Sequence, residues 1–165
     1  MQTIETLLSS LPQTGSVRWI GVRPDKGASM VEPDAVQLTA KSGIIGDRYQ
    51  GRSGTRQVTL IQFEHLAVVA SVMGLENLPP ALLRRNIAVS GINLLALKNQ
   101  RFSIGATQLE WTGLCHPCTK METILGPGGY NALRGHGGIT ARVVEEGVIR
   151  IGDQVALIGG SEERD

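Results

Sequence analysis

The chain contains two cysteines, Cys115 and Cys118, which lie three residues apart with His116 and Pro117 between them. A thiolate is a soft metal ligand and a strong nucleophile, so this segment is the first candidate for chemistry. The spacing fits a thioredoxin-like redox pair, but the rest of the chain lacks that fold's regular alternation of strands and helices. It also fits part of a zinc site, but Cys115, Cys118 and His116 supply at most three of the four ligands required. Two buried, inert thiols are the remaining interpretation.

The neighbours of Cys118 favour a reactive or metal-binding thiolate over a packing residue. A helix is expected to begin near Pro117, which places Cys118 in its first turn. Unpaired backbone N–H groups and the helix dipole stabilise an anion at that position, and Lys120 adds a positive charge. Cys118 is therefore a candidate for a catalytic residue or for a metal ligand.

A second candidate is the sequence Arg84-Arg85-Asn86, which stands directly before an apolar strand. Arginine binds phosphate through two parallel hydrogen bonds, and asparagine both donates and accepts, as recognition of a pterin requires. The alternative is a solvated helix end, where a positive charge is favoured in any case.

A third candidate is the loop expected at residues 43–54, which is rich in glycine and includes Asp47, Arg48 and Arg52. With Arg56, these arginines form a local anion trap in a chain of low net charge, although a plain long loop is the alternative. The glycine-rich segment 128–138, with His136, lacks the phosphate-loop pattern and is either a lid or a connection. His65 lies on a predicted helix and is expected at the surface or at the edge of the core.

The pattern of alternating apolar residues predicts many short strands and a few helices. Helices are expected at 63–73, ended by Gly74, at 80–85, and from the cysteine segment through Ile124. The fold class is therefore α+β, mostly β, with a barrel-like sheet. One domain is expected over 1–165, with its core at about 16–158, an N-terminal extension at 1–15 and a polar tail at 159–165. Strands are predicted at 16–22, 35–40, 57–61, 86–90, 101–105, 108–112, 139–144, 148–150 and 154–158.

The overall composition indicates an ordinary globular protein. Of 165 residues, 41% are hydrophobic and 19% charged, and the net charge of +1 gives no reason to expect nucleic acid or an anionic membrane as a partner. No apolar run reaches the roughly 20 residues that span a bilayer, and no signal peptide is evident. Two cysteines are too few for a disulfide framework, so a reducing, cytoplasmic location is expected.

Taken together, these segments resemble the MOSC domain, the C-terminal module of molybdenum cofactor sulfurases that also occurs as stand-alone bacterial proteins. The resemblance implies a mostly β, barrel-like fold, and it makes Cys118, the cysteine after proline, the signature thiol. In relatives that reduce N-hydroxylated compounds, the matching cysteine ligates molybdenum held by a pyranopterin. The likeness runs from about residue 16 to 158 and rests on segments 43–48, 57–61, 84–87, 112–118, 138–144 and 149–153.

The resemblance also implies a cofactor and partners. The cofactor is molybdenum cofactor (molybdopterin), with Cys118 as metal ligand and with Arg84, Asn86, Arg48, Asp47 and Lys120 around the pterin and its phosphate. The implied function is reduction of N-hydroxylated compounds by oxygen-atom transfer. A separate reductase must supply the electrons, because the chain has no ferredoxin-like set of cysteines.

Two other functions are compatible with the resemblance. One is a non-catalytic cofactor or sulfur carrier, loaded as a Cys118 persulfide by a sulfur-donor protein, so whether the chain is an enzyme stays open. The other is a MOSC-like fold that has lost its ligand. The chain departs from many members by having Cys115 and His116 where they have arginine and asparagine, and residues 52–54 where some reductases have His-Gly-Gly. The extra thiol allows a Cys115–Cys118 disulfide, which would remove the metal ligand.

Overall fold

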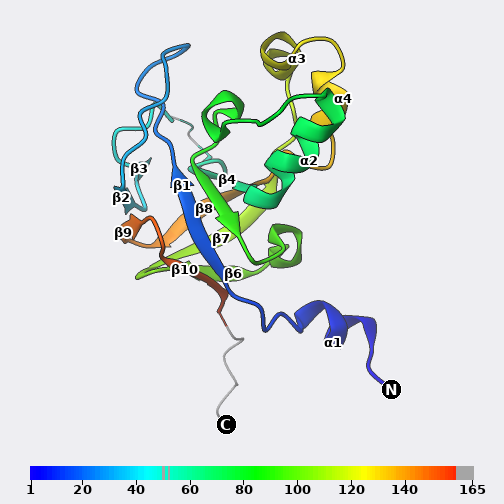
Figure 1. Ribbon diagram of the computed structural model, residues 1–165. Helices are drawn as coiled ribbons and strands as arrows, with labels where there is room; N and C mark the ends of the chain where they lie inside the picture. The colour runs from blue at the N-terminus through cyan, green and yellow to red at the C-terminus, as the bar shows by residue number, and fades with distance from the viewer. Residues whose placement is uncertain (50, 52, 159–165) are drawn as a thin grey trace.

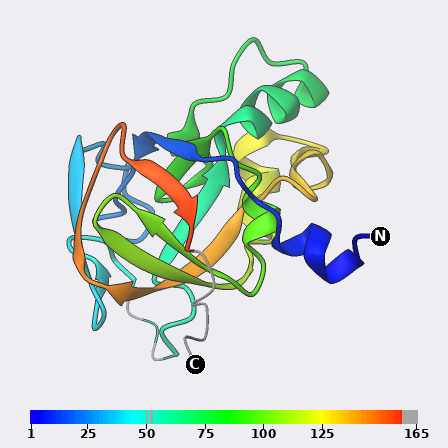
Figure 2. The same ribbon diagram turned by 90° about the horizontal axis from the view of Figure 1, so that it is seen from below.

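The computed structural model describes residues 1–49, 51 and 53–158. Arg52 of the predicted anion trap and the polar tail at 159–165 lie outside the described residues. Seven strands close into a barrel in the order β1-β10-β6-β7-β8-β4-β5 (Figures 1 and 2). All neighbours are antiparallel except β4 and β5, which are parallel. The strands are β1 Gly15–Ile20, β4 Val58–Gln62, β5 Ile87–Ser90, β6 Arg101–Ile104, β7 Thr107–Leu114, β8 Ile139–Glu145 and β10 Gln154–Leu157.

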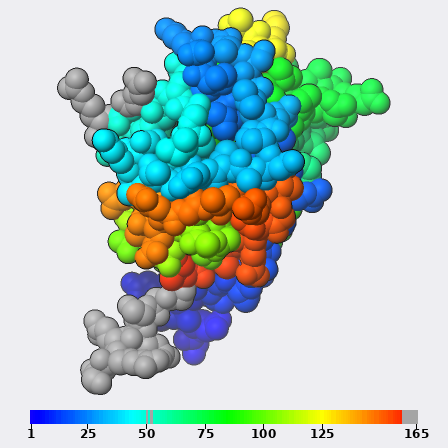
Figure 3. Space-filling model, turned by 90° about the vertical axis from the view of Figure 1, so that its left-hand side faces the viewer, coloured from blue at the N-terminus to red at the C-terminus, as the bar shows by residue number. Residues whose placement is uncertain are grey.

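A three-stranded sheet in the order β3-β2-β9 lies against one side of the barrel, and its strands face the viewer in Figure 3. Its members are β2 Ala35–Thr39, β3 Gly43–Ile44 and β9 Gly147–Arg150. Every strand predicted from the sequence has a counterpart whose ends differ by no more than two residues. The prediction of an uninterrupted loop at 43–54 was wrong at its start, because Gly43 and Ile44 pair with Thr39 and Leu38.

Strands β4 and β5 are buried on both faces, which places them at the centre of the molecule. Leu60 of β4 and Ile87 and Val89 of β5 belong to the core cluster in the barrel interior. Ile61 and Ala88 alternate with them and face a second cluster under the helices. Since successive strand residues point to opposite faces, this alternation explains why both segments read as nearly continuous apolar runs.

The longest helix, α2 (Phe63–Met73), covers the outer face of these two strands (Figure 1). Its buried residues Leu66, Val69 and Ala70 have the i, i+3, i+4 spacing of one helix face. It ends at Gly74, which adopts the left-handed conformation at φ 68° that glycine accepts without strain. The prediction of this helix and of its end is confirmed.

The shorter helices differ more from the predictions. The helix expected at 80–85 is a 3₁₀ turn, η1 (Pro80–Leu83), and the helix expected near Pro117 is α3 (Thr119–Leu125). The glycine-rich segment expected to be a lid or connection contains α4 (Gly129–Leu133), and η2 (Leu94–Leu97) was not predicted. The N-terminal extension contains α1 (Ile4–Ser9), which has no buried residue and stands away from the barrel (Figures 1 and 2).

The sequence-based fold class is confirmed: the protein is mostly β, with a closed barrel and short helices. Over the described ranges, none of the helices combines the length and apolar character that crossing a membrane requires.

Candidate functional site

The site is built on a buried ion pair between Arg23 and Asp47. The Arg23 guanidinium donates to both carboxylate oxygens of Asp47, from Nε at 3.1 Å and from Nη2 at 2.8 Å, and the backbone N–H of Arg23 adds a third bond at 2.9 Å. The side chain of Asp47 is fully buried. Burial, the largest single influence, opposes its ionisation, but the bonds and charge of Arg23, with the N–H of Tyr49, outweigh burial and hold the pKa of Asp47 below its ordinary value.

Asn86 lies behind Asp47. Its side-chain oxygen accepts from the backbone N–H and the hydroxyl of Thr59, both at 3.1 Å. Its amide nitrogen donates to the carbonyl of Gly21 and to Asp47, also at 3.1 Å. An asparagine side chain has two donors and two acceptor positions, so all four are used by protein atoms. The sequence led us to expect Asn86 beside a ligand; the structure places it where it holds Asp47.

Arg84 faces a cavity of about 300 Å³ together with two other cations. The cavity is lined by Gly27, Arg48, Arg84, Lys120, Thr123 and Ile124. Nη1 of Arg84 donates to the carbonyl of Ala28 at 2.7 Å, whereas its Nη2 is buried and has no hydrogen-bond partner in the described chain. Burial and the charges of Arg23 and Arg48 lower the pKa of Arg84, and Asp47 opposes this shift. Such an excess of positive charge favours an anionic ligand.

The backbone of Arg84 is also unusual, because it adopts the left-handed conformation at φ 56°. A residue with a Cβ is strained there by roughly 1 kcal/mol or more, so glycine would be the easier choice. The conformation follows from the position of Arg84 as the C-cap of η1. It turns the chain so that the guanidinium reaches the segment at 22–31, which stands at the same end of the molecule as α3 (Figure 3).

Cys118 is exposed and is the N-cap of α3, two residues before Lys120. The helix begins one residue after it, so Cys118 does not lie inside the first turn as predicted, and its sulfur makes no capping hydrogen bond. Cys115 is buried, with 2% of its surface exposed, and both thiols are free. The backbone between them forms neither a helix nor a turn.

A second guanidinium, that of Arg85, lies beneath the cysteine segment. Arg85 is only 7% exposed; Nε donates to the carbonyl of Gly137 and Nη1 to that of Leu83, both at 2.9 Å. Burial is the main cause that lowers the pKa of Arg85, while Cys115 and Cys118 raise it and Arg56 lowers it further. Arg85 therefore interacts electrostatically with both thiols and with a second arginine.

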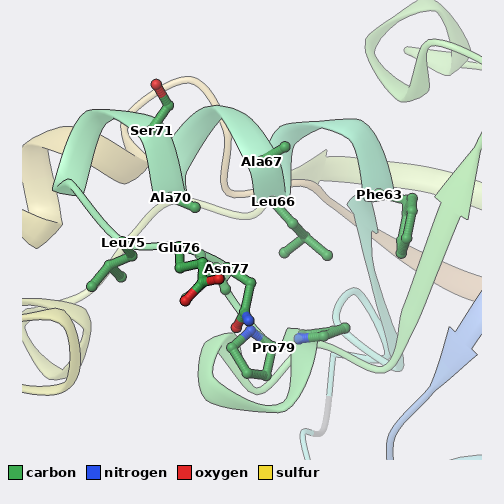
Figure 4. Close-up of a pocket in the computed structure, with 11 residues that line it drawn as sticks. Phe63, Leu66, Ala67, Ala70, Ser71, Leu75, Glu76, Asn77 and Pro79 are labelled. Carbon is green, nitrogen blue, oxygen red and sulfur yellow. The ribbon is translucent and has the colours of Figure 1, made fainter.

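Another cavity, of about 580 Å³, is lined mainly by apolar side chains of α2 and of the segment that follows it (Figure 4). Glu76 is the charged residue that lines it, so this cavity lacks the cluster of positive charges found in the cavity of Arg84. In another cavity, His65 and His136 meet edge to face with ring centroids 4.7 Å apart. Burial, then the charge of His136, lowers the pKa of His65, and Glu64 opposes this.

Within the described residues, no group of three or more His, Cys, Asp or Glu side chains is arranged to hold a metal ion.

The structure thus brings Arg48, Arg84 and Lys120 together around one cavity, with Asp47 and Asn86 behind them and Cys118 at the start of the neighbouring helix. Sequence reasoning missed Arg23 as the partner of Asp47 and the burial of Arg85. The sequence signal for the burial of Arg85 was its position directly before an apolar strand, where an unpaired charged side chain is uncommon.

Comparisons with known proteins agree with this architecture. The family model of the MOSC domain matches residues 45–156. No curated protein gives a significant sequence match. Among solved structures, the YuaD protein from Bacillus subtilis is similar with a TM-score of 0.76 and 21% identity, over 90% of this chain and 98% of that one.

YiiM proteins from two bacteria are also similar in fold. The protein from Geobacillus stearothermophilus has a TM-score of 0.69 and 15% identity, over 90% of this chain and 77% of its own. The protein from Escherichia coli has a TM-score of 0.67 and 17% identity, over 91% of this chain and 72% of its own. At these identities the likeness concerns the fold.

Proposed function

Because the chain belongs to the MOSC domain family, we propose that it binds molybdenum cofactor, with Arg48, Arg84 and Lys120 around the cofactor's phosphate and Cys118 as the thiolate ligand of the metal. The observation that carries this proposal is the convergence of three cations, from three separate segments, on one cavity. The unpartnered Nη2 of Arg84 supplies a donor for a phosphate oxygen.

The residues present fit the group in charge and in size. A cavity of about 300 Å³ is at the small end of ligand pockets, which suits the phosphate end of a larger molecule. The Arg23–Asp47 pair and Asn86 hold the wall of this cavity in place. Cys118 is exposed, so a bulky ligand can reach its sulfur.

We further propose that the holo-protein reduces N-hydroxylated compounds by oxygen-atom transfer. The cofactor supplies the redox chemistry, while the chain supplies the thiolate of Cys118 and a cationic surface for an anionic group. Two cysteines cannot hold an iron–sulfur relay, so the electrons must come from a separate reductase.

The test of cofactor binding uses protein made in a host that produces the cofactor. Molybdenum and the phosphorylated pterin are both measured per chain, by elemental analysis and by fluorescence of the oxidised pterin. We expect Cys118→Ala to lose the metal, and Arg84→Ala to weaken binding by about 1.5–3 kcal/mol, the loss of a charge-assisted hydrogen bond. Arg150→Ala, at an exposed arginine of β9, is the matched control.

A wild-type chain that carries neither pterin nor metal would remove this proposal, as would equal retention by the Arg84 and Arg150 variants. The reductase activity is tested separately, with loaded protein, a partner reductase and an N-hydroxylated purine. Full loading without turnover would leave the binding function and exclude the reductase.

The second candidate is a sulfur carrier, favoured by an exposed thiol with a buried guanidinium nearby. In this function, the thiolate of Cys118 takes the terminal sulfur from the persulfide of a donor protein, and the donor's thiolate leaves. Mass spectrometry after incubation with a cysteine desulfurase tests it. One added sulfur atom on Cys118 supports the carrier, and an unmodified thiol excludes it.

A further inference from the structure

Arg85 is a buried cation that makes no ion pair with a carboxylate in the described part of the chain. Two of its three nitrogens donate to backbone carbonyls, and Nη2 is buried with no partner. An unpaired buried charge costs several kcal/mol, so a protein retains one where something else balances it.

The surroundings of Arg85 add a second cation and no acid. Nη2 of Arg56 lies 3.8 Å from the sulfur of Cys115, and the charge of Arg56 acts on Arg85. Gly137 closes the other side: a Cβ added to it would be 3.5 Å from Nη2 of Arg85 and would overlap the carbonyl oxygen of Cys115. Glycine therefore lets this loop lie directly against the buried guanidinium.

The side chains of Arg84 and Arg85 lie in different surroundings, although the two residues are consecutive. Arg84 bonds to the carbonyl of Ala28 and lines the cavity with Arg48 and Lys120. Arg85 bonds to the carbonyl of Gly137, beside Cys115. A single anion at the Arg84 cavity consequently leaves the charge of Arg85 unbalanced.

We propose that Arg85 and Arg56 form an inner anion site beside Cys115, distinct from the Arg84 cavity, and that it binds a small tetrahedral oxyanion such as sulfate, thiosulfate or molybdate. A planar guanidinium presents N–H donors to the oxygens of such an ion, and Arg85 has one such donor unused. Arg56 is exposed and supplies the second cation from the solvent side. The site does not depend on the pterin, so it stands apart from the proposed function.

The experiment uses the full chain made in a host that lacks the cofactor, which separates this test from that of cofactor binding. Sulfate, thiosulfate and molybdate are titrated by calorimetry at constant ionic strength, with chloride as background. The titrations are made in an Arg84→Gln background, which weakens the other cationic cavity. We expect saturable binding in this background, and a loss of about tenfold or more when Arg85→Gln is added, because a charge-assisted bond is lost. Arg150→Gln, at an exposed arginine of β9, is the matched control in that background and should change the affinity by less than about twofold.

A second readout covers the case in which Arg85→Gln fails to fold. Bound anion should slow the alkylation of Cys118 in the wild type, and Arg85→Lys, which keeps the charge without the planar fork, should reduce this protection. Preference for molybdate would identify a metal oxyanion as the ligand, and preference for thiosulfate a sulfur compound. The inference is overturned if none of the three ions binds in the Arg84→Gln background, or if Arg150→Gln weakens binding there as much as Arg85→Gln.

Discussion

Replacing Asp47 by asparagine tests whether the ion pair beneath the site is an essential support. The substitution removes the charge that faces Arg23 and leaves an amide opposite the donors of Arg23, Tyr49 and Asn86. Breaking a buried ion pair costs about 3–5 kcal/mol. Arg23 keeps 18% of its side chain exposed, so water partly compensates its charge, and we expect a loss of about 3 kcal/mol.

The assay is urea unfolding followed by circular dichroism, for Asp47→Asn, Arg23→Gln and the double variant. A loss of about 3 kcal/mol corresponds to a fall in Tm of roughly 6–12 °C for a chain of this size. If the two side chains act as a pair, the double variant should lose about 1–3 kcal/mol less than the sum of the single variants. Glu110→Gln, in the partly exposed ion pairs with Arg101 and Arg142, is the control and should cost about 1 kcal/mol or less.

The same variants have a pH signature with a defined sign. Because the folded state depresses the pKa of Asp47, its carboxylate stabilises the fold fully above the ordinary pKa of 3.8, and this stabilisation is lost as the pH falls through the lower, folded value. The difference between wild type and Asp47→Asn should therefore be constant near neutrality and shrink in acid. Strictly additive losses, or a difference that grows in acid, would refute the reasoning.

Two further changes test how the segments around the site are held. The carboxylate of Glu122 in α3 accepts from the N–H groups of Gly128 and Tyr130 at the start of α4, and these bonds lower its pKa. Glu122→Gln should lower the Tm near neutral pH. The difference from wild type should be complete above the ordinary pKa of 4.5 and disappear as the pH falls through the lower, folded-state value. An equal Tm at pH 7 would show that the link between α3 and α4 is dispensable. Gly137→Ala should destabilise the chain by about 2 kcal/mol or more, because the added Cβ meets the backbone of Cys115. Gly74→Ala, with open space around it, is the control and should cost only about 1 kcal/mol. Equal losses of stability in urea unfolding would contradict this.

Local patterns in the sequence were sufficient to predict most of the barrel. Alternation located the strands, and the apolar spacing of α2 with Gly74 after it located the helix and its end, because both depend on neighbours along the chain. The strand β3 was missed because two residues carry no periodicity. The helix α4 was missed because its start depends on Glu122, a contact that a glycine-rich sequence does not reveal.

The candidate site was predictable as a set of residues but not as an arrangement. Arg48, Arg84 and Lys120 could be selected by charge and motif, and the structure brings them to one cavity. Asn86 was expected beside a ligand, but its place behind Asp47 depends on the pairing of β4 with β5, which brings Thr59 to it. The burial of Arg85 was unpredictable in the same way, because a long cationic side chain is usually exposed.

Closure of the barrel has a consequence for how this chain behaves at high concentration. A barrel has no terminal strand, so its backbone N–H and C=O groups offer no template for another chain. In the accompanying sheet, the outer strands are β3, with two residues, and β9, with four, which is too short for extended pairing. Within the described ranges, aggregation through strand addition is therefore disfavoured by topology itself.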